Sequence, residues 1–348
     1  MYSVSRCGKM KRLLIVEYVT GGGLADSELP GSLLFEARLM LNAVMADLHS
    51  LGLFDLKVLC DARLVSGLSW STDSNPEYLV VTKASGFDAV WKQAIDKVDA
   101  VLVIAPETDA ILSRLCEDVE KAEKVLLNSS SQVVSVAASK LKTYEILKAA
   151  RLPVIETKAL PGNASWIFPL VVKPDDGVGC DSLVVVEDQQ SLDRLIASTN
   201  HRNLVVQPWV AGQAASLSVI FSEHSTQLLT YNQQLITVER GCVSLAGCLV
   251  GSQTAYFDVY QSILSAIVTC MPGLRGYVGI DVIETQAGPV IVEINPRLTT
   301  SYAGLGKAIG VNPAALILQS FYFQTVYSEP ARTVPEKPVR IELAQPYV

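Results

Sequence analysis

The sequence predicts a protein of mixed α/β and α+β class, in which a layer of parallel strands and helices precedes a region dominated by strands. Up to about residue 127, short apolar runs alternate with spacers long enough for a helix, which is typical of a parallel sheet covered on both faces. From about residue 168, strand patterns follow one another closely. The 348 residues are 49% hydrophobic and only 18% charged, so about two domains can each bury a core.

Composition excludes several classes of function. The chain has 28 Lys and Arg against 35 Asp and Glu, a net charge of −7, which offers no basic face for nucleic acid. No apolar run approaches the roughly 18 to 20 residues of a membrane helix. Seven cysteines without a Cys-x-x-Cys pair do not form a disulfide framework. We therefore expect a cytoplasmic protein with no membrane partner.

The first region, residues 11–130, is predicted to be Rossmann-like. Residues 1–10 lack the apolar core of a signal peptide, and we expect a loose N-terminus there. A helix is predicted over roughly residues 33–51. The predicted strands are 13–16, 57–59, 100–105 and 125–127.

A glycine turn, Gly21-Gly-Gly23, follows the first predicted strand, where a nucleotide-binding fold has its phosphate loop. Its spacing is not Gly-x-Gly-x-x-Gly, and no acidic residue ends a clear second strand about twenty positions further on. A Rossmann oxidoreductase would rest on this turn alone. We expect a flexible turn, with Gly22 and Gly23 able to contact a substrate.

The pattern changes after Asn128-Ser-Ser-Ser131, which predicts a domain boundary near residue 130. Helices are expected over about 139–150 and 257–271, and two more close the chain. The predicted strands are 170–173, 182–186, 204–207, 215–222, 227–239, 279–283 and 290–295.

Two lysines are candidates for binding an anion. Lys173 ends an apolar strand and leads into a turn with Gly177 and Gly179, whose backbone N–H groups suit phosphate oxygens. The alternative is a hairpin with a solvated lysine. Lys140 begins a predicted helix, where the helix dipole opposes a cation, so that a bound anion would help to explain it. A surface lysine is the alternative there.

Three oxygen ligands are predicted to converge on the last two strands. Glu293 and Asn295 are two residues apart and face the same side, and a short turn places Asp281 on the neighbouring antiparallel strand. Two carboxylates and an amide, completed by phosphate oxygens, suit Mg²⁺. A salt bridge between Glu293 and Arg297 is the alternative, and Arg297 would otherwise clamp an anionic substrate.

A strand that breaks at a proline provides a candidate adenine site. Gln207, Pro208, Trp209 and Val210 form a hinge that can expose backbone groups to an adenine edge, with Trp209 or Val210 beside the ring. A buried tryptophan at a domain junction is the alternative.

In their order, these motifs resemble the ATP-grasp superfamily of carboxylate-amine ligases over about residues 130–300. The resemblance implies a Rossmann-like pre-ATP-grasp domain at 11–130, a lid or small subdomain at 131–212 and a C-terminal catalytic subdomain at 213–348. It implies that ATP phosphorylates a carboxylate to an acyl phosphate, which an amine then attacks, with Lys173 and Arg297 as catalytic residues. The implied ligands are Lys140, Lys173, Gly177, Gly179, Gln207, Trp209, Val210 and Gln213 for ATP, and Asp281, Glu293 and Asn295 for one or two Mg²⁺ or Mn²⁺ ions.

Two segments are similar to the tyramine–glutamate ligase branch of that superfamily, which serves methanofuran-type C1-carrier cofactor biosynthesis. These are Glu17-Tyr-Val-Thr-Gly-Gly-Gly23 and Glu293-Ile-Asn-Pro-Arg-Leu-Thr-Thr-Ser-Tyr302. The branch implies glutamate as the carboxylate and tyramine, tyrosine or a similar amine as acceptor; a homodimer is compatible with it. The implied substrate contacts are Gly22, Gly23, Arg275, Arg297, Thr299, Thr300 and Ser301.

The sequence departs from the superfamily at three positions. Pro208 and Ala214 stand where acidic residues are common, and Gly279 stands where an arginine often precedes the metal-binding Asp. Arg275 or Arg240 is then a candidate to replace that arginine. These departures leave two alternatives: a catalytically weak ATP-binding homologue that acts as a partner subunit, or a ligase of the same fold for other amino acids or purine-type substrates.

Overall fold

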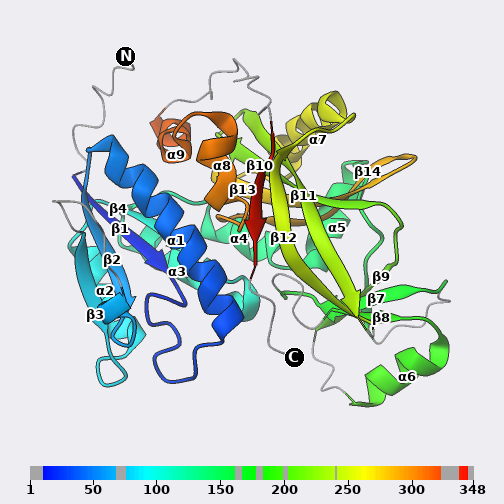
Figure 1. Ribbon diagram of the computed structural model, residues 1–348, viewed down its shortest axis with the longest axis horizontal. Coiled ribbons are helices and arrows are strands. Elements are labelled where there is room, and N and C mark those ends of the chain that lie inside the picture. The colour runs from blue at the N-terminus through cyan, green and yellow to red at the C-terminus, as the bar shows by residue number, and fades with distance from the viewer. Residues whose placement is uncertain are drawn as a thin grey trace.

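The protein is built on two β-sheets with helices packed around and between them (Figure 1). The computed structural model describes residues 11–67, 76–160, 167–177, 183–198, 203–239, 241–322 and 337–343. Within these residues, no helix is both long and apolar enough to cross a bilayer.

The first sheet is parallel and has the strand order β3-β2-β1-β4-β5. Its strands are β1 (Arg12–Glu17), β2 (Asp55–Asp61), β3 (Glu77–Val81), β4 (Ala100–Ile104) and β5 (Val125–Leu126). Its helices are α1 (Gly31–Leu51), α2 (Phe87–Asp96) and α3 (Ile111–Lys121), and short 3-10 turns lie at η1 (Val65–Gly67) and η2 (Thr108–Ala110). The predicted strands and the predicted helix of this region are confirmed; β3 and the exact helices in the spacers were not foreseen.

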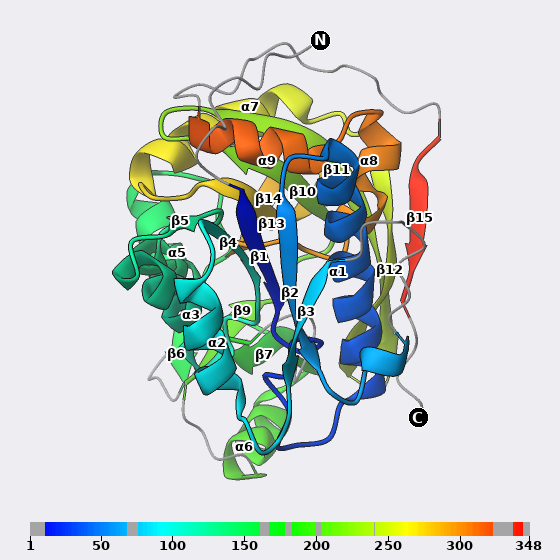
Figure 2. The ribbon, with the colours of Figure 1, turned by 90° about the vertical axis from the view of Figure 1, so that its left-hand side faces the viewer.

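Alternation along β1 explains why helices cover both faces of this sheet. Leu13 and Ile15 are buried in the core that α1 covers, whereas Leu14 and Val16 are buried in the core that contains Trp91 of α2. Successive strand residues point to opposite faces, so a continuous apolar run needs cover on both sides. Figure 2 shows α1 on one side of these strands and α2 with α3 on the other.

The second sheet is antiparallel throughout and follows the path β14-β13-β10-β11-β12-β8-β7-β9-β6, with β15 paired to β12. Its large part consists of β10 (Gln213–Phe221), β11 (Thr226–Glu239), β12 (Cys242–Ser252), β13 (Gly276–Thr285), β14 (Gly288–Asn295) and β15 (Val339–Glu342). Its small part consists of β6 (Lys158–Leu160), β7 (Leu170–Pro174), β8 (Val184–Val186) and β9 (Leu204–Pro208).

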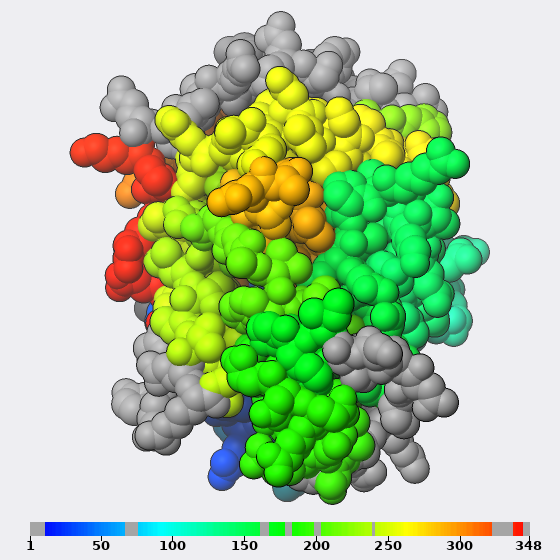
Figure 3. Space-filling model, turned by 90° about the vertical axis from the view of Figure 1, so that its right-hand side faces the viewer, coloured from blue at the N-terminus to red at the C-terminus, as the bar shows by residue number. Residues whose placement is uncertain are grey.

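The small part lies at one end of the molecule, and we call it the lid after the expected subdomain. A single residue pair, Cys242 with Val184, joins its strand β8 to β12. Helix α6 (Gln189–Ser198) covers the lid strands, with Leu192 buried in their core. In Figure 3 the green lid forms the lower end of the face, below the yellow-green strands.

Helices of the second half bury the large sheet and tie it to the first. These are α4 (Ser131–Ala137), α5 (Lys140–Ala149), α7 (Phe257–Cys270), α8 (Tyr302–Ile309) and α9 (Pro313–Tyr322). Tyr302 and Leu305 of α8 share a core with Leu41 of α1. The Tyr302 hydroxyl also donates to Asp47 at 2.8 Å. Helix α1 is therefore held between the two sheets, and it forms a wall of the space between them.

Candidate active site

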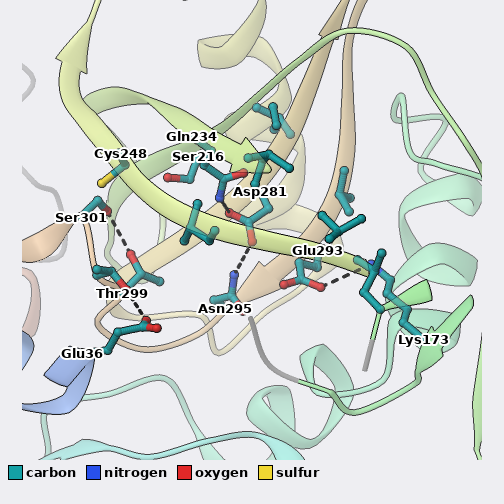
Figure 4. Close-up of a pocket in the computed structure, with 18 of the residues that line it drawn as sticks. Glu36, Lys173, Ser216, Gln234, Cys248, Asp281, Glu293, Asn295, Thr299 and Ser301 are labelled. Carbon is teal, nitrogen blue, oxygen red and sulfur yellow. Dashed lines mark hydrogen bonds and ion pairs between the residues drawn. The ribbon is translucent and has the colours of Figure 1, made fainter. Parts of the chain in front are cut away.

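A cavity of about 870 Å³ lies where the first sheet, the lid and the large sheet meet. Side chains from β1, α1, β7, β9, β10, β11, β13 and β14 line it. Its volume is within the usual range for small-molecule sites. Figure 4 shows Lys173 and Glu293 on one side of Asp281 and Asn295, with Glu36, Thr299, Ser301 and Cys248 on the other.

Lys140 and Lys173 meet at Glu293. The two ammonium nitrogens lie 3.5 and 3.6 Å from the Glu293 carboxylate, and the lysine residues are each only 6% exposed. The alternative of a solvated lysine is therefore wrong at both positions. Although burial favours the protonated acid, the two lysines lower the pKa of Glu293 below its ordinary value. The site thus holds two buried cations against one carboxylate, which is a suitable environment for a phosphate group.

Local chain geometry explains how Lys140 comes to be buried. Ser139 caps the start of α5 by accepting from the Lys142 N–H, and it donates to Asp175 at 2.6 Å. The Leu141 N–H donates to the same carboxylate at 2.9 Å. The Lys140 ammonium then donates to the carbonyl of Gly177 at 2.6 Å. The sequence predicts a Gly177 N–H that points at an anion, but this N–H donates to the Pro174 carbonyl at 3.3 Å, and Gly177 meets Lys140 through its carbonyl. Gly179 lies outside the described residues.

The three predicted metal ligands converge. Asp281 on β13 is the direct register partner of Glu293 on β14, and the Asn295 amide donates to Asp281 at 3.1 Å. Gln234 on β11 donates to the other Asp281 oxygen at 3.0 Å. Burial, together with the neighbouring Glu293 carboxylate, raises the pKa of Asp281 above its ordinary value. A divalent cation would reverse this cost, because it stabilises the ionised carboxylate.

The donor set fits Mg²⁺ only in part. Within the described residues, no group of three or more His, Cys, Asp or Glu side chains can hold a metal ion. The site instead offers the carboxylates of Asp281 and Glu293 and the amide of Asn295. The Asn295 amide group already donates to Asp281 and orients it. Mg²⁺ commonly takes one or two carboxylates and completes its octahedron with water and substrate phosphates. The residues present therefore fit a Mg²⁺ ion that arrives with a nucleotide.

The hinge residues line the same cavity from β9 and β10. Gln207 is buried and donates to the Thr157 hydroxyl at 2.9 Å. Trp209 is 40% exposed, so the alternative of a buried tryptophan is wrong. Val210 and Gln213 also face the cavity, and Gln213 accepts from Gln233 at 3.0 Å. This part of the cavity presents apolar and amide groups, which suit a flat heterocycle with polar edges.

Arg297 connects the late strands with the first sheet. Its Nε donates to both Glu107 oxygens at 3.0 and 2.9 Å, so the alternative of a Glu293–Arg297 pair is not what the structure contains. Although burial opposes the charge, Glu107 holds the pKa of Arg297 above its ordinary value. Arg297 lines the cavity together with Thr299, Thr300 and Ser301. It is therefore a buried cation available on the cavity wall.

Three predicted substrate contacts lie elsewhere. A Cβ on Gly22 would lie 2.6 Å from Val81, and one on Gly23 would lie 2.3 Å from the Tyr18 ring; neither glycine lines the cavity. The Arg275 guanidinium donates to the Ser320 and Phe321 carbonyls and stacks over the Phe321 ring, away from the cavity. The glycine turn serves close packing, and Arg275 joins β13 to α9. The other replacement considered, Arg240, lies outside the described residues.

Packing explains the missing arginine at position 279. A Cβ there would lie 2.5 Å from the Thr299 methyl carbon. Thr299 occupies this space because its hydroxyl bonds to Tyr277 at 2.9 Å and to Ser301 at 3.0 Å. The hydroxyl network and an arginine at this position are therefore incompatible without rearrangement.

Sequence reasoning missed several residues that line the cavity or hold a residue that lines it. Gln234 orients Asp281, Glu107 holds Arg297, and Glu36 of α1 accepts a hydrogen bond from the Thr300 hydroxyl at 3.0 Å. Each lies on an element remote in sequence from its partner. The periodicity of α1 predicts which side chains share an apolar face of the helix. It does not predict which part of the chain packs against that face.

Comparison with known families identifies the fold. The profile of the ATP-grasp domain family matches residues 137–301, and that of the pre ATP-grasp 3 domain matches residues 54–134. The solved structure of an ATP-grasp superfamily protein from Archaeoglobus fulgidus superposes with a TM-score of 0.68 at 22% identity and covers 88% of each chain. The fold and the site thus define an ATP-dependent ligase that joins a carboxylate to an amine.

Two curated relatives agree with this class. Tyramine–L-glutamate ligase from Methanocaldococcus jannaschii is 30% identical over 233 residues, which span 66% of this chain and 67% of the relative. The enzyme of the same name from Methanocaldococcus fervens is 31% identical over 210 residues, spanning 60% of this chain and 62% of the relative. The chain belongs to the ATP-grasp family.

Proposed function

We propose that this protein uses ATP and Mg²⁺ to activate glutamate and joins it to tyramine, tyrosine or a similar aromatic amine, within the synthesis of a C1-carrier cofactor. The observation that carries the proposal is the buried Lys140–Glu293–Lys173 group facing Asp281 and Asn295. The similarity to the two tyramine–L-glutamate ligases supports the choice of substrates. The proposed domains are 11–130, 131–212 for the lid side and 213–348 for the catalytic side.

In this proposal, residues of the lid and of the neighbouring elements α5 and β10 hold the nucleotide. Trp209, Val210 and Gln213, which line the cavity, contact the adenine and ribose. Lys173 on the cavity wall and Lys140 beside Glu293 bind phosphate oxygens. Asp281, Glu293 and Asn295 hold Mg²⁺, which neutralises phosphate charge as the γ-phosphoryl group transfers. Phosphates bound at the two lysines would take the place of Glu293 as their anionic partner, and Glu293 would then be able to hold the metal ion. The protein would thus exchange its two ion pairs at Glu293 for contacts of both lysines and of Glu293 with the ligands.

The carboxylate substrate is proposed to lie beside Arg297. Its oxygen attacks the γ-phosphorus, the bond from that phosphorus to ADP breaks, and an acyl phosphate forms. The ammonium group of the amine loses a proton, and the neutral nitrogen attacks the acyl carbon. The bond from that carbon to the phosphate oxygen breaks, inorganic phosphate leaves, and the nitrogen loses a second proton as the amide forms. Catalysis requires position and charge balance here rather than a nucleophilic side chain. Arg297, with Thr299 and Thr300 nearby, provides a cation and hydroxyl groups on that wall.

Release of ADP tests this function. The protein is mixed with ATP, Mg²⁺ and glutamate, and ADP is measured without acceptor and with tyramine, tyrosine or other amines, while mass spectrometry identifies any amide. We expect acceptor-dependent ADP release and a glutamyl amide with an aromatic amine. Turnover only with other amino acids or purine-type acceptors would reassign the substrates. Measurable ATP binding without release for any acceptor would indicate a non-catalytic partner subunit.

A further inference from the structure

One end of the cavity is formed by α1 rather than by the lid. We call this end the α1 chamber and define it by Leu24, Leu33, Glu36, Ala37, Met40 and Thr300, all of which line the cavity. In Figure 4 its Glu36 lies beyond Asp281 and Asn295 on the side opposite Lys173. The chamber is thus continuous with the site of acyl transfer but separate from the lid residues proposed to hold ATP.

Helical periodicity explains why the chamber has one carboxylate among apolar side chains. Leu33, Glu36, Ala37 and Met40 occupy positions i, i+3, i+4 and i+7 of α1 and therefore share one face of the helix. Ala37 and Met40 are buried, and Glu36 is half-buried between them. A carboxylate on such a face can pair with a cation whose attached carbon atoms contact the apolar side chains around it.

The position of Glu36 is fixed from two directions. The Thr300 hydroxyl donates to the Glu36 carboxylate at 3.0 Å. Thr300 is three residues after Arg297 in the chain, so this bond ties Glu36 to the segment that carries Arg297. Further along α1, Asp47 accepts from the Tyr302 hydroxyl, and its carbonyl accepts from Asn312. The helix is therefore anchored against the same loop and helices that present Arg297, so Glu36 is held in a constant position relative to the acyl site.

The neighbouring carboxylates are engaged differently. Glu107 is bound to Arg297 through both oxygens, and Glu17 accepts from the Val19 and Thr20 backbone N–H groups of its own turn. Glu36, which accepts from the Thr300 hydroxyl, lies on the chamber wall together with Leu33 and Met40. A primary amine with an apolar body matches this wall, because such amines have pKa values near that of lysine, about 10, and arrive as ammonium ions.

We propose that Glu36 binds the ammonium group of the acceptor amine and that Leu24, Leu33 and Met40 contact its apolar body. This inference rests on the proposed ligase function and assigns the acceptor end of the cavity, leaving glutamate beside Arg297. The apolar side chains of Leu24, Leu33, Ala37 and Met40 match the apolar body of such an amine better than the polar groups attached to the α-carbon of glutamate. Glu36 is then the residue that selects a cationic, apolar acceptor.

Replacement of Glu36 by Gln provides the first test. The amide keeps the shape and still accepts from Thr300, but it removes the charge. We expect the KM for tyramine to rise about 10- to 100-fold, the range for loss of one charge-assisted hydrogen bond. The KM values for ATP and glutamate should not change. Glu145→Gln, an exposed position on α5 outside the cavity, is the matched control and should behave as wild type.

Hydroxylamine separates this inference from the ligase function itself. It is small and uncharged at neutral pH, so it can trap the acyl phosphate as a hydroxamate without a cation site. We expect Glu36→Gln to form glutamyl hydroxamate at the wild-type rate, which also shows that the variant is folded. Wild-type protein that forms no hydroxamate would overturn the proposed function together with this inference. Normal hydroxamate formation with an unchanged tyramine KM, or with a raised glutamate KM, would overturn the inference alone.

A binding measurement completes the test without turnover. Calorimetry compares tyramine with 4-ethylphenol, which has the same body without the amino group, in the presence of a non-hydrolysable ATP analogue and Mg²⁺. We expect wild type to bind tyramine at least 10-fold more tightly and Glu36→Gln to lose that preference. Equal affinity of the wild type for the two compounds would overturn the assignment of Glu36.

Discussion

Glu293 links the charges of the site, because its carboxylate is the shared neighbour of two buried ammonium groups and the register partner of Asp281. The two lysines stabilise the ionised form of Glu293, whereas burial and the Glu293 carboxylate together raise the pKa of Asp281. A nucleotide that brings phosphates and a metal ion supplies new partners to both signs of charge. The resting ion pairs therefore hold the proposed site in shape before ATP binds.

Replacing Lys173 or Glu293 should distinguish the effect of this ion pair on turnover from its effect on the stability of the fold. We expect Lys173→Ala and Glu293→Ala each to lower turnover at least 100-fold, since each removes a preorganised charge from the proposed phosphoryl-transfer site. Glu293→Ala should also lower the free energy of unfolding by about 3 kcal/mol, because it leaves two buried lysines without their carboxylate. Steady-state ADP release and urea unfolding measure the two effects.

The same variants also report on nucleotide binding. The rise in melting temperature that ATP and Mg²⁺ produce together in wild type should shrink in both variants, since a ligand stabilises only to the extent that it binds the folded state. Exposed Glu145→Gln controls for a general effect of lost charge. Wild-type turnover in both variants would contradict the site.

At the scale of elements, sequence patterns predicted the strands and helices whose side chains are buried on one face or on both. The continuous apolar run of β4 and the capped start of α5 are examples. Strand β12 was missed because its small residues form no strand-like run, and Gly247, with a φ of +154°, lies in close contact with β15. Its pairing with β11 and β15 makes it a strand, and that pairing is a tertiary property.

The residues of the candidate site also differ in whether the sequence alone could group them. Asp281, Glu293 and Asn295 could be grouped from the sequence because one hairpin and the two-residue period of a strand bring them together. Glu36 and Glu107 could not, because their partners Thr300 and Arg297 are far away in the chain. Short-range patterns thus predicted the half of the site built from one hairpin, whereas the half shared between modules required the fold.

Asp175 provides a prediction about an element. Its carboxylate accepts from Ser139 and Leu141. It thus joins the loop after β7 to the start of α5, whose first residue is Lys140. We expect Asp175→Ala to lower stability by about 1 kcal/mol, as for loss of a helix cap, and to raise the KM for ATP because Lys140 loses its support. Thermal unfolding and ADP release measure these changes.

A matched cap lies on the lid helix. Asp188 accepts from the Ser191 N–H at 2.7 Å at the start of α6, outside the cavity. Asp188→Ala should lower the melting temperature without changing the KM for ATP. An unchanged KM for ATP in Asp175→Ala as well would show that Lys140 does not depend on this cap.

At the scale of the whole molecule, the first sheet and the large sheet are joined by polar contacts as well as by a shared core. Glu107, just before η2, pairs with Arg297 beyond β14, and Asp47 of α1 accepts from Tyr302 of α8. The lid also reaches the first sheet, because the Asp109 N–H donates to Asp176 at 3.0 Å. The cavity is consequently enclosed by three parts whose relative position depends on a few specific side chains.

The Glu107–Arg297 pair should govern both this arrangement and the reaction. Both side chains are largely buried, at 5% and 13% exposure, so Glu107→Gln leaves an uncompensated cation between the sheets. We expect a loss of about 3 kcal/mol in urea unfolding and a fall in kcat/KM for glutamate, since Arg297 is free to move from its position. Glu117→Gln, which breaks the exposed Glu117–Lys121 pair on α3, is the control and should leave both quantities unchanged. If Glu107→Gln matched this control, the two sheets would be held together by their apolar core alone, and the position of Arg297 would not depend on its partner.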